Sequence, residues 1–273
     1  MKPSCISLIT DFGLSDEYVG VMKGVIASIN PHTTVIDITH HIAPQNIIQA
    51  AYTLWFSYAY FPQNTVHVVV VDPGVGSTRK IVALKTEKAY FLAPDNGVLS
   101  LILNEHPCTA VYVDRSEFFL KTVSGTFHGR DIFAPVAAHL SKTRNLYQFG
   151  STIPSTQVVT LSNPLPYIEN DTLFGQVVMT DHFGNIISNI SEKDLDRIGL
   201  ANGLNESACI HIKDKRIAGI VGHYGQCKKG ELLAILGSKG FLEISINCGN
   251  ASQEIAVEIG CQICITKNND LTK

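Results

Sequence analysis

Residues 65–76 read TVHVVVVDPGVG, and this stretch is the most informative about the fold. Its run of valines from Val68 to Val71 lacks the polar alternation of a strand with one face in water. The sequence therefore predicts a strand buried on both faces, at the centre of a largely parallel sheet. The run ends at Asp72, and the turn-forming residues Pro73 and Gly74 follow. We expect a carboxylate at the tip of the most buried strand.

Strand-like and helix-like segments alternate on both sides of this stretch, which is typical of an α/β domain. The expected order is a strand and loop at 5–13, a helix at 15–30, a strand at 34–39, a helix at 44–61, the valine strand, a hairpin-like strand pair and a helix within 80–103, a strand at 109–115 and a helix at 131–142. We predict that this α/β domain spans residues 1–160.

The helical periodicity fades after the proline-bearing stretch at 163–171. Short β-branched runs then follow, interrupted by glycines at intervals of about ten residues. These runs lie at 172–190, 208–213, 216–225, 231–247 and 254–266. The sequence predicts a linker at 161–170, followed by a smaller all-β barrel or sandwich domain over residues 171–273.

Composition excludes several classes of protein. The chain has 273 residues, of which 45% are hydrophobic and 16% charged, so it does not resemble a disordered chain. A net charge of −3 gives no general attraction to phosphate backbones, so we expect a small-molecule ligand rather than nucleic acid. The longest apolar stretch, 50–61, falls short of the roughly 20 residues that a membrane span needs. The first residues lack the apolar core of a secretory leader, and we expect a cytoplasmic protein without membrane association.

The seven cysteines do not indicate a disulfide framework or a metal site. Their number is odd, and the one CxxC pair, Cys261 and Cys264, has no second pair or ligand-spaced histidines beside it. We therefore expect reduced thiols, no metal and no cofactor.

Asp11 ends the first predicted strand, and Asp16 follows in the same loop. Loops after strand carboxyl ends line the ligand crevice of α/β sheets, so Asp11 is well placed to accept two hydrogen bonds from a vicinal diol such as a ribose. The alternative interpretation is that Asp11 or Ser15 caps the helix that begins near Asp16.

Three side chains suit acid–base or electrostatic chemistry. Asp72 follows the valine strand, and Arg79 could be the cationic neighbour of this carboxylate. The loop between them lacks the Gly/Lys spacing of a phosphate-binding loop, and its turn residues could be purely structural. His128, in the glycine-flanked loop TFHG, is placed to exchange protons, although most single histidines have no chemical role.

In the second domain, one loop holds Asp181, Phe183 and Asn185, and another region holds Ser238 and Glu243. An aromatic ring beside amide and carboxyl groups could stack on a base and hydrogen-bond it. The same residues are also ordinary in turns.

Seven segments together resemble a known family. They are TDFG (10–13), DPGVGSTR (72–79), PDNG (94–97), TFHGRDIFAP (126–135), DHFGN (181–185), GSKGFLEISIN (237–247) and GNA (249–251). In this order, and across both predicted domains, they are similar to the S-adenosyl-L-methionine hydroxide adenosyltransferases, the hydrolase relatives of fluorinase and chlorinase.

The resemblance implies hydrolysis of S-adenosyl-L-methionine to adenosine and L-methionine in a homotrimer. Each active site would lie between the N-terminal domain of one subunit and the C-terminal domain of the next. The resemblance also implies a role for each motif residue. Asp72, Arg79 and His128 would activate water, Asp11 would hold the ribose diol, and Asp16 would match the acid that receives the methionine ammonium group. The nucleoside would be contacted by Asp181, Phe183 and Asn185, and the pocket completed by Ser238, Glu243 and the Ile246 backbone. For the mechanism, we predict that His128 passes the proton on.

Departures from the halogenase branch favour water as the nucleophile. Where fluorinase has a tyrosine this chain has Asp72, and where fluorinase has a halide-seating serine it has Gly129. A carboxylate would repel a halide anion. Gln45 stands where fluorinase has an aromatic residue, which leaves ribose packing open. The alternatives are a non-catalytic adenosine or S-adenosyl-L-methionine binding module and a halide-dependent adenosyltransferase.

Overall fold

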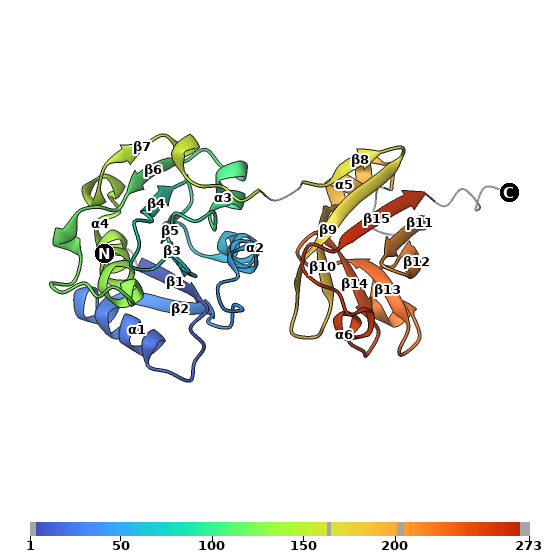
Figure 1. Cartoon of the computed structure of the whole chain (residues 1–273), viewed down its shortest axis with the longest axis horizontal. Coiled ribbons are helices and arrows are strands. Elements are labelled where there is room, and N and C mark those ends of the chain that lie inside the picture. Colours follow the sequence, from blue (N-terminus) through green and yellow to red (C-terminus); the bar gives the residue numbers. More distant parts are fainter. Residues whose placement is uncertain (1–3, 163–164, 201–204, 268–273) are drawn as a thin grey trace. The chain divides into compact units, whose positions relative to one another are not determined.

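The structure is a computed structural model and describes residues 4–162, 165–200 and 205–267. The chain divides into two compact units, an N-terminal unit of residues 1–162 and a C-terminal unit of residues 163–273 (Figure 1). In the helices of the described ranges, none is long and apolar enough to span a bilayer.

The N-terminal unit is built on a seven-stranded mixed sheet. Its strands are β1 (Ser4–Thr10), β2 (Thr33–Thr39), β3 (Val66–Val70), β4 (Ile81–Lys85), β5 (Tyr90–Pro94), β6 (Thr109–Tyr112) and β7 (Thr152–Ile153), in the spatial order β2-β1-β3-β5-β4-β6-β7. The pairs from β2 to β5 are parallel, and the pairs β5-β4, β4-β6 and β6-β7 are antiparallel. The predicted parallel arrangement therefore holds for one half of the sheet only. The turn at 86–89 makes β4 and β5 a hairpin, and a short turn can join only antiparallel neighbours.

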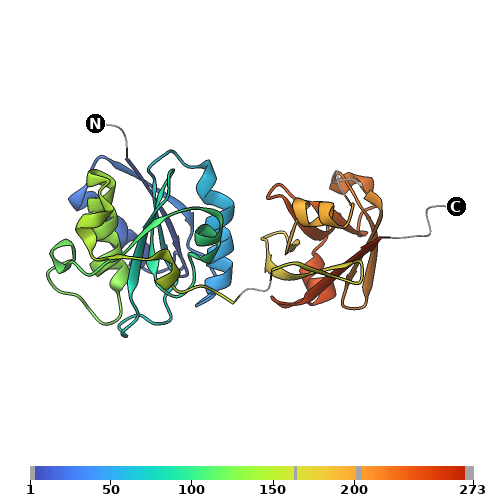
Figure 2. The same cartoon turned by 90° about the horizontal axis from the view of Figure 1, so that it is seen from above.

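Helices cover both faces of this sheet (Figure 2). They are α1 (Tyr18–Ile29), α2 (Ile47–Ser57), α3 (Ser100–Glu105) and α4 (Ala134–Thr143). Val68 and Val70 of the valine run pack into the core under α1 and α4, whereas Val69 and Val71 pack into the core under α2. The prediction that this strand is buried on both faces is confirmed.

The sheet brings two strand ends together. β1 and β3 are parallel neighbours, and Thr10 lies in register with Val70. Asp11 and Asp72 therefore leave the same edge of the sheet from adjacent strands. α4 packs against both strands, and the segment before it carries His128 to this edge.

The C-terminal unit is an antiparallel, nearly closed barrel. Its strands are β8 (Tyr167–Glu169), β9 (Thr172–Thr180), β10 (Ile186–Ser191), β11 (Asn205–Ile212), β12 (Lys215–Ile220), β13 (Leu232–Leu236), β14 (Phe241–Ile246) and β15 (Gln262–Lys267). The order is β12-β11-β15-β9-β10-β14-β13, with β8 added on β9 inside the range predicted as a linker. The two ends of this order meet where the Val221 N–H donates to the Ala234 carbonyl at 2.9 Å.

Two short helices of this unit were not expected from the sequence. α5 (Glu192–Arg197) begins at a capping box formed by Ser191 and Asp194, and α6 (Ala251–Ile255) begins at Asn250, whose side chain accepts the Gln253 N–H. Helices of five or six residues are too short to show a 3.6-residue periodicity, and α6 takes in the first two residues of the strand-like run expected at 254–266.

Candidate active site

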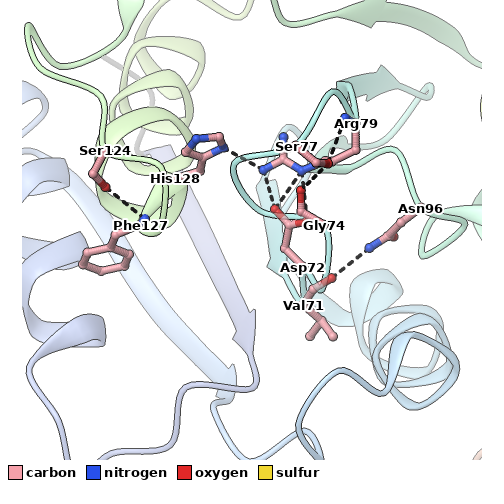
Figure 3. A network of polar contacts seen from close by, with 9 residues as sticks. All are labelled: Val71, Asp72, Gly74, Ser77, Arg79, Asn96, Ser124, Phe127 and His128. Carbon is pink, nitrogen blue, oxygen red and sulfur yellow. Dashed lines mark hydrogen bonds and ion pairs between the residues drawn. The ribbon is translucent and has the colours of Figure 1, made fainter.

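A buried ion pair stands at the carboxyl end of β3 (Figure 3). Arg79 Nε donates to Oδ1 and to Oδ2 of Asp72, each at 2.9 Å, and Arg79 Nη2 also donates to Oδ2. The Asp72 side chain is 6% exposed and that of Arg79 12%. A guanidinium that binds a carboxylate through two nitrogens fixes its orientation as well as its charge environment. Asp72 therefore has a defined direction before any ligand binds.

His128 lies on the other side of the same guanidinium (Figure 3), with its Nδ1 2.8 Å from Arg79 Nη2. A guanidinium has only N–H donors, so we assign Nδ1 as the acceptor and the ring proton to Nε2. Burial lowers the pKa of His128, and the charge of Arg79 lowers it further, against the opposing charges of Asp72 and Asp131 and a hydrogen bond to the Ser124 backbone. The lowered pKa and the acceptor role of Nδ1 both favour the neutral ring, and Arg79 links Asp72 to His128.

Backbone contacts hold the two loops of this site together. Gly76 has φ +76°, and a Cβ at this position would lie 2.1 Å from the Gly125 carbonyl oxygen, so only glycine allows this approach. The loop before His128 is tied in turn by Asp131, whose buried carboxylate accepts the Ser124 N–H at 2.8 Å. A turn of π-helix at Gly129–Phe133 follows His128, a feature that is frequent at functional sites.

A cavity of about 340 Å³ opens beside the ion pair. It is lined by Asp11, Phe12, Tyr18, Gln45, Val70, Asp72, Pro73, Val75, Thr126, Phe127, His128 and Gly129. The structure therefore brings Asp11, Asp72 and His128, three residues predicted from the sequence, to one pocket. Arg79 is not among the lining residues, but it is hydrogen-bonded to two of them, Asp72 and His128.

Asp11 does not cap a helix. α1 begins after Glu17 without a side-chain cap, and Asp11 Oδ2 instead accepts the Gln45 N–H at 2.8 Å. Gln45 has φ +65°, in the left-handed region, which is uncommon for a residue with a side chain and concentrates at functional sites. Each carboxylate oxygen has two lone pairs, so Asp11 can still accept hydrogen bonds from a diol in the pocket.

Three aromatic rings in the pocket wall were not identified from the sequence. Phe12, Tyr18 and Phe127 pack edge to face or tilted, with ring centroids 4.9–5.9 Å apart. Each of the three lies within two residues of a polar residue that was singled out from the sequence. They were not chosen as site residues because aromatic side chains in such positions usually belong to the hydrophobic core. Asp16 lies exposed in the loop before α1 and is not among the residues that line the pocket.

In the C-terminal unit, Asp181 organises the turn between β9 and β10. Its Oδ1 accepts the N–H groups of Phe183 and Asn185 at 2.9 Å each, and its Oδ2 accepts Asn185 Nδ2 at 2.8 Å. Phe183 is 73% exposed at the tip of this turn. An exposed aromatic ring on a hydrogen-bonded turn is suited to stacking on a flat ligand.

Glu243 lies close to this turn and is buried. Burial raises its pKa, the charge of Asp181 raises it as well, and Lys239 and a 3.3 Å hydrogen bond from the Tyr224 hydroxyl oppose the rise. Tyr224, which the sequence analysis missed, could have been found only through this contact. Ser238 lies exposed in the turn between β13 and β14, and Ile246 is buried at the end of β14.

In the described ranges, no group of three or more His, Cys, Asp or Glu side chains is arranged to hold a metal ion. The seven cysteines are free thiols.

Comparison with known proteins identifies the family. The SAM hydroxide adenosyltransferase N-terminal domain matches residues 6–150, and the C-terminal domain of the same family matches residues 175–264. The chain is 34% identical to the (R)-S-adenosyl-L-methionine hydrolase of Salinispora tropica, over 96% of this chain and 97% of that protein. It is 24% identical to the fluorinase of an Actinoplanes species, over 96% and 97% of the two chains.

A solved structure of an uncharacterised conserved protein from Thermotoga maritima is also similar. The identity is 39%, the match covers 96% of this chain and 100% of that one, and the TM-score is 0.90. From these matches, the chain belongs to the SAM hydroxide adenosyltransferase family.

Proposed function

We propose that this protein hydrolyses S-adenosyl-L-methionine to adenosine and L-methionine. The observation that carries the proposal is the Asp72–Arg79–His128 array beside a pocket that also contains Asp11. The name of the Salinispora relative supports the same reaction and specifies the (R) form of the substrate. The sulfonium sulfur is a stereocentre, so the two epimers would present the methionine chain in different directions.

The reaction needs little activation of the electrophile. Water oxygen bonds to the ribose 5′ carbon while the carbon–sulfur bond breaks, and methionine leaves with the electron pair as a neutral thioether. One water proton is released, so S-adenosyl-L-methionine and water give adenosine, methionine and a proton. The main task of the enzyme is to hold water in line behind the carbon, and no cofactor is proposed for it.

Asp72 is the group best suited to hold that water. Its two oxygens bind Arg79, but the second lone pair of Oδ1 remains for a water hydrogen. Because Arg79 and His128 fix the carboxylate in advance, water is oriented without reorganisation of the site. In this state His128 Nδ1 is occupied by Arg79, so a proton passed from Asp72 to His128 requires Arg79 to change partners.

The nucleoside is proposed to bind to residues of an N-terminal unit and of a C-terminal unit. Asp11 would accept the ribose hydroxyls, Phe183 would stack on the adenine, and Asn185 would hydrogen-bond the nucleoside. As the family resemblance implies, these groups would come from different subunits of a homotrimer. The pocket of one N-terminal unit would be completed by the C-terminal unit of a neighbouring subunit, with Asp181, Ser238, Glu243 and Ile246 at its wall, and Asp16 would receive the methionine ammonium.

Local packing disfavours the halide-dependent alternative. A Cβ on Gly129 would lie 3.0 Å from Phe127 Cε2 and 3.2 Å from Met22 Sδ. The serine that seats a halide in fluorinase could fit here only if these neighbours moved, and the Asp72 carboxylate would repel the anion.

Incubation with each epimer of S-adenosyl-L-methionine in ¹⁸O-water tests the reaction. We expect adenosine labelled at its 5′-hydroxyl, at the same rate with and without added chloride or fluoride. A 5′-halo-adenosine product would support the halide-dependent transferase. Tight binding of adenosine without any turnover would support the non-catalytic module.

Mixing two inactive variants tests the shared site. Asp72→Asn damages only the N-terminal unit and Asn185→Ala only the C-terminal unit. If sites form between subunits, refolded one-to-one mixtures regain about a quarter of wild-type activity, because each half-site is intact in half of the subunits. Mixtures that stay inactive would show that each chain builds its own site.

A further inference from the structure

A line of polar contacts, made of two hydrogen bonds and one close Asp37–His40 contact, runs from the surface to the base of the pocket and takes no part in the proposed chemistry. Lys23 Nζ donates to Asp37 Oδ2 at 2.5 Å, and Asp37 Oδ1 lies 3.1 Å from His40 Nε2. His40 Nδ1 in turn lies 2.8 Å from Thr10 Oγ1. His40 is 2% exposed and Thr10 is fully buried.

The line ends at the peptide that follows Asp11. Thr10 Oγ1 accepts the Phe12 N–H at 3.2 Å, and the His40 carbonyl accepts the Gly13 N–H at 2.7 Å. These two bonds fix the backbone on the carboxyl side of Asp11. Segment 40–45 holds the turn at 10–13 through His40, whose Nδ1 contacts Thr10 and whose carbonyl accepts the Gly13 N–H, and the Gln45 N–H donates to Asp11 itself.

The donors and acceptors along this line have one consistent direction. Burial would raise the pKa of Asp37, but hydrogen bonds from Lys23 and His40 outweigh it and lower the pKa, so this carboxylate is an acceptor. His40 Nε2 faces this carboxylate and therefore carries a proton, and we assign Nδ1 as the acceptor of the Thr10 hydroxyl proton. The Thr10 hydroxyl then donates to His40 and keeps a lone pair for the Phe12 N–H.

We propose that Thr10, His40 and Asp37 are positioning residues, which set the direction of the Asp11 carboxylate and so the affinity for the nucleoside. None of the three lines the pocket, so their effect on a ligand must pass through Asp11 and Phe12. Thr10 cannot act on the ligand directly, because it is fully buried and bonded on both sides. The inference rests on the proposed function, since it takes adenosine as the product that Asp11 binds.

The test is a double-mutant cycle on adenosine binding, measured by calorimetry on the full chain. Thr10→Val keeps the shape of the side chain and removes the hydroxyl, and we expect the Kd for adenosine to rise about tenfold, the usual effect of one buried hydrogen bond. In an Asp11→Asn background, the same substitution should change Kd less than about twofold, because the group it positions is already altered. Thr10→Ser, which keeps the hydroxyl, should restore wild-type affinity.

Ser7→Ala is the matched control for folding. Ser7 lies in the same strand, is equally buried, and has a hydroxyl 2.7 Å from a histidine nitrogen, Nδ1 of His67, away from the pocket. We expect it to lower Tm about as much as Thr10→Val and to leave Kd unchanged. A Kd that rises by the same factor in both backgrounds, or that Thr10→Ser fails to restore, would overturn the inference. Wild-type protein that fails to bind adenosine would instead overturn the proposed function.

Discussion

Replacing Asp72 by asparagine removes the carboxylate with almost no change in volume. In the structure this group is 6% exposed, is held by two nitrogens of Arg79 and faces the pocket. An amide keeps one oxygen acceptor but carries no charge and cannot take a proton. We therefore predict that Asp72→Asn fails mainly in the chemical step.

The expected loss in kcat is about 10²–10⁴-fold, the usual range for acid–base groups, which corresponds to about 2.7–5.4 kcal/mol of transition-state stabilisation. The KM should change little, because Asp11 and the C-terminal unit are untouched. The variant should also be less stable, by up to about 3 kcal/mol, because Arg79 loses its partner but keeps some contact with solvent. For a unit of this size the decrease in Tm would be about 6–12 °C, so kcat is measured by adenosine release well below that temperature.

Asp95→Asn is the matched control. Asp95 belongs to the same unit and its Oδ1 accepts the Val159 N–H at 2.8 Å, but it does not line the pocket. We expect its kcat to stay within about twofold of wild type. An Asp72→Asn protein that is folded and keeps its kcat would refute the role given to this carboxylate, and equal losses in both variants would point to a general effect on the fold.

Three further predictions concern groups that titrate. Arg79→Met should raise the pKa of His128, because the guanidinium charge adds to burial in lowering it, and an NMR titration of the ring that shows no rise would contradict this geometry. Burial lowers the pKa of His67 to about 3, below its ordinary value of about 6.5, so the folded state binds fewer protons between these values. The contribution of His67 to the free energy of unfolding should be fully present above about pH 6.5 and fall toward pH 3 by up to about 1.4 kcal/mol per pH unit. In urea unfolding, the Ser7→Ala/His67→Phe variant should lack this part of the pH dependence. Burial raises the pKa of Glu243, so its ionisation costs stability as pH rises, and Glu243→Gln should raise Tm at pH 7 but not at pH 4.

The sequence was sufficient to predict the strand that is buried on both faces. The valine run predicted a strand with both faces covered, and β3 is that strand, the third of seven in the sheet, between two helical layers. The direction of the later strands was harder, because periodicity reports which faces are buried and not which neighbour a strand chooses. The hairpin of β4 and β5 was expected, but the antiparallel pairing of β4 with β6 was not, and the sheet as a whole is mixed rather than largely parallel.

The site was predictable where a polar residue follows a strand directly. Asp11 and Asp72 fulfil that condition. Arg79 and His128 were candidates from their own loops, and the family resemblance joined them to Asp72; they lie 49 residues apart in the chain and meet at 2.8 Å. Tyr224 and His40 had no such position in the pattern. Each is connected to the candidate site by one side-chain contact, Tyr224 with Glu243 and His40 with Thr10. These contacts exist only after folding, so the sequence pattern does not reveal them.

The parallel half of the sheet and the chemistry of the site are connected. The loops that follow two parallel neighbouring strands begin at the same edge of the sheet. Because Thr10 pairs with Val70, Asp11 and Asp72 both lie at this edge, and each has a different hydrogen-bond partner. Asp11 is bound to a peptide N–H, which would suit its proposed role of holding a neutral diol, whereas Asp72 is bound to a guanidinium. Asp72 need not be a strong base, because an oxygen that has just bonded to carbon carries a strongly acidic proton. Direction matters more than basicity in this reaction, and direction is what Arg79 and His128 supply.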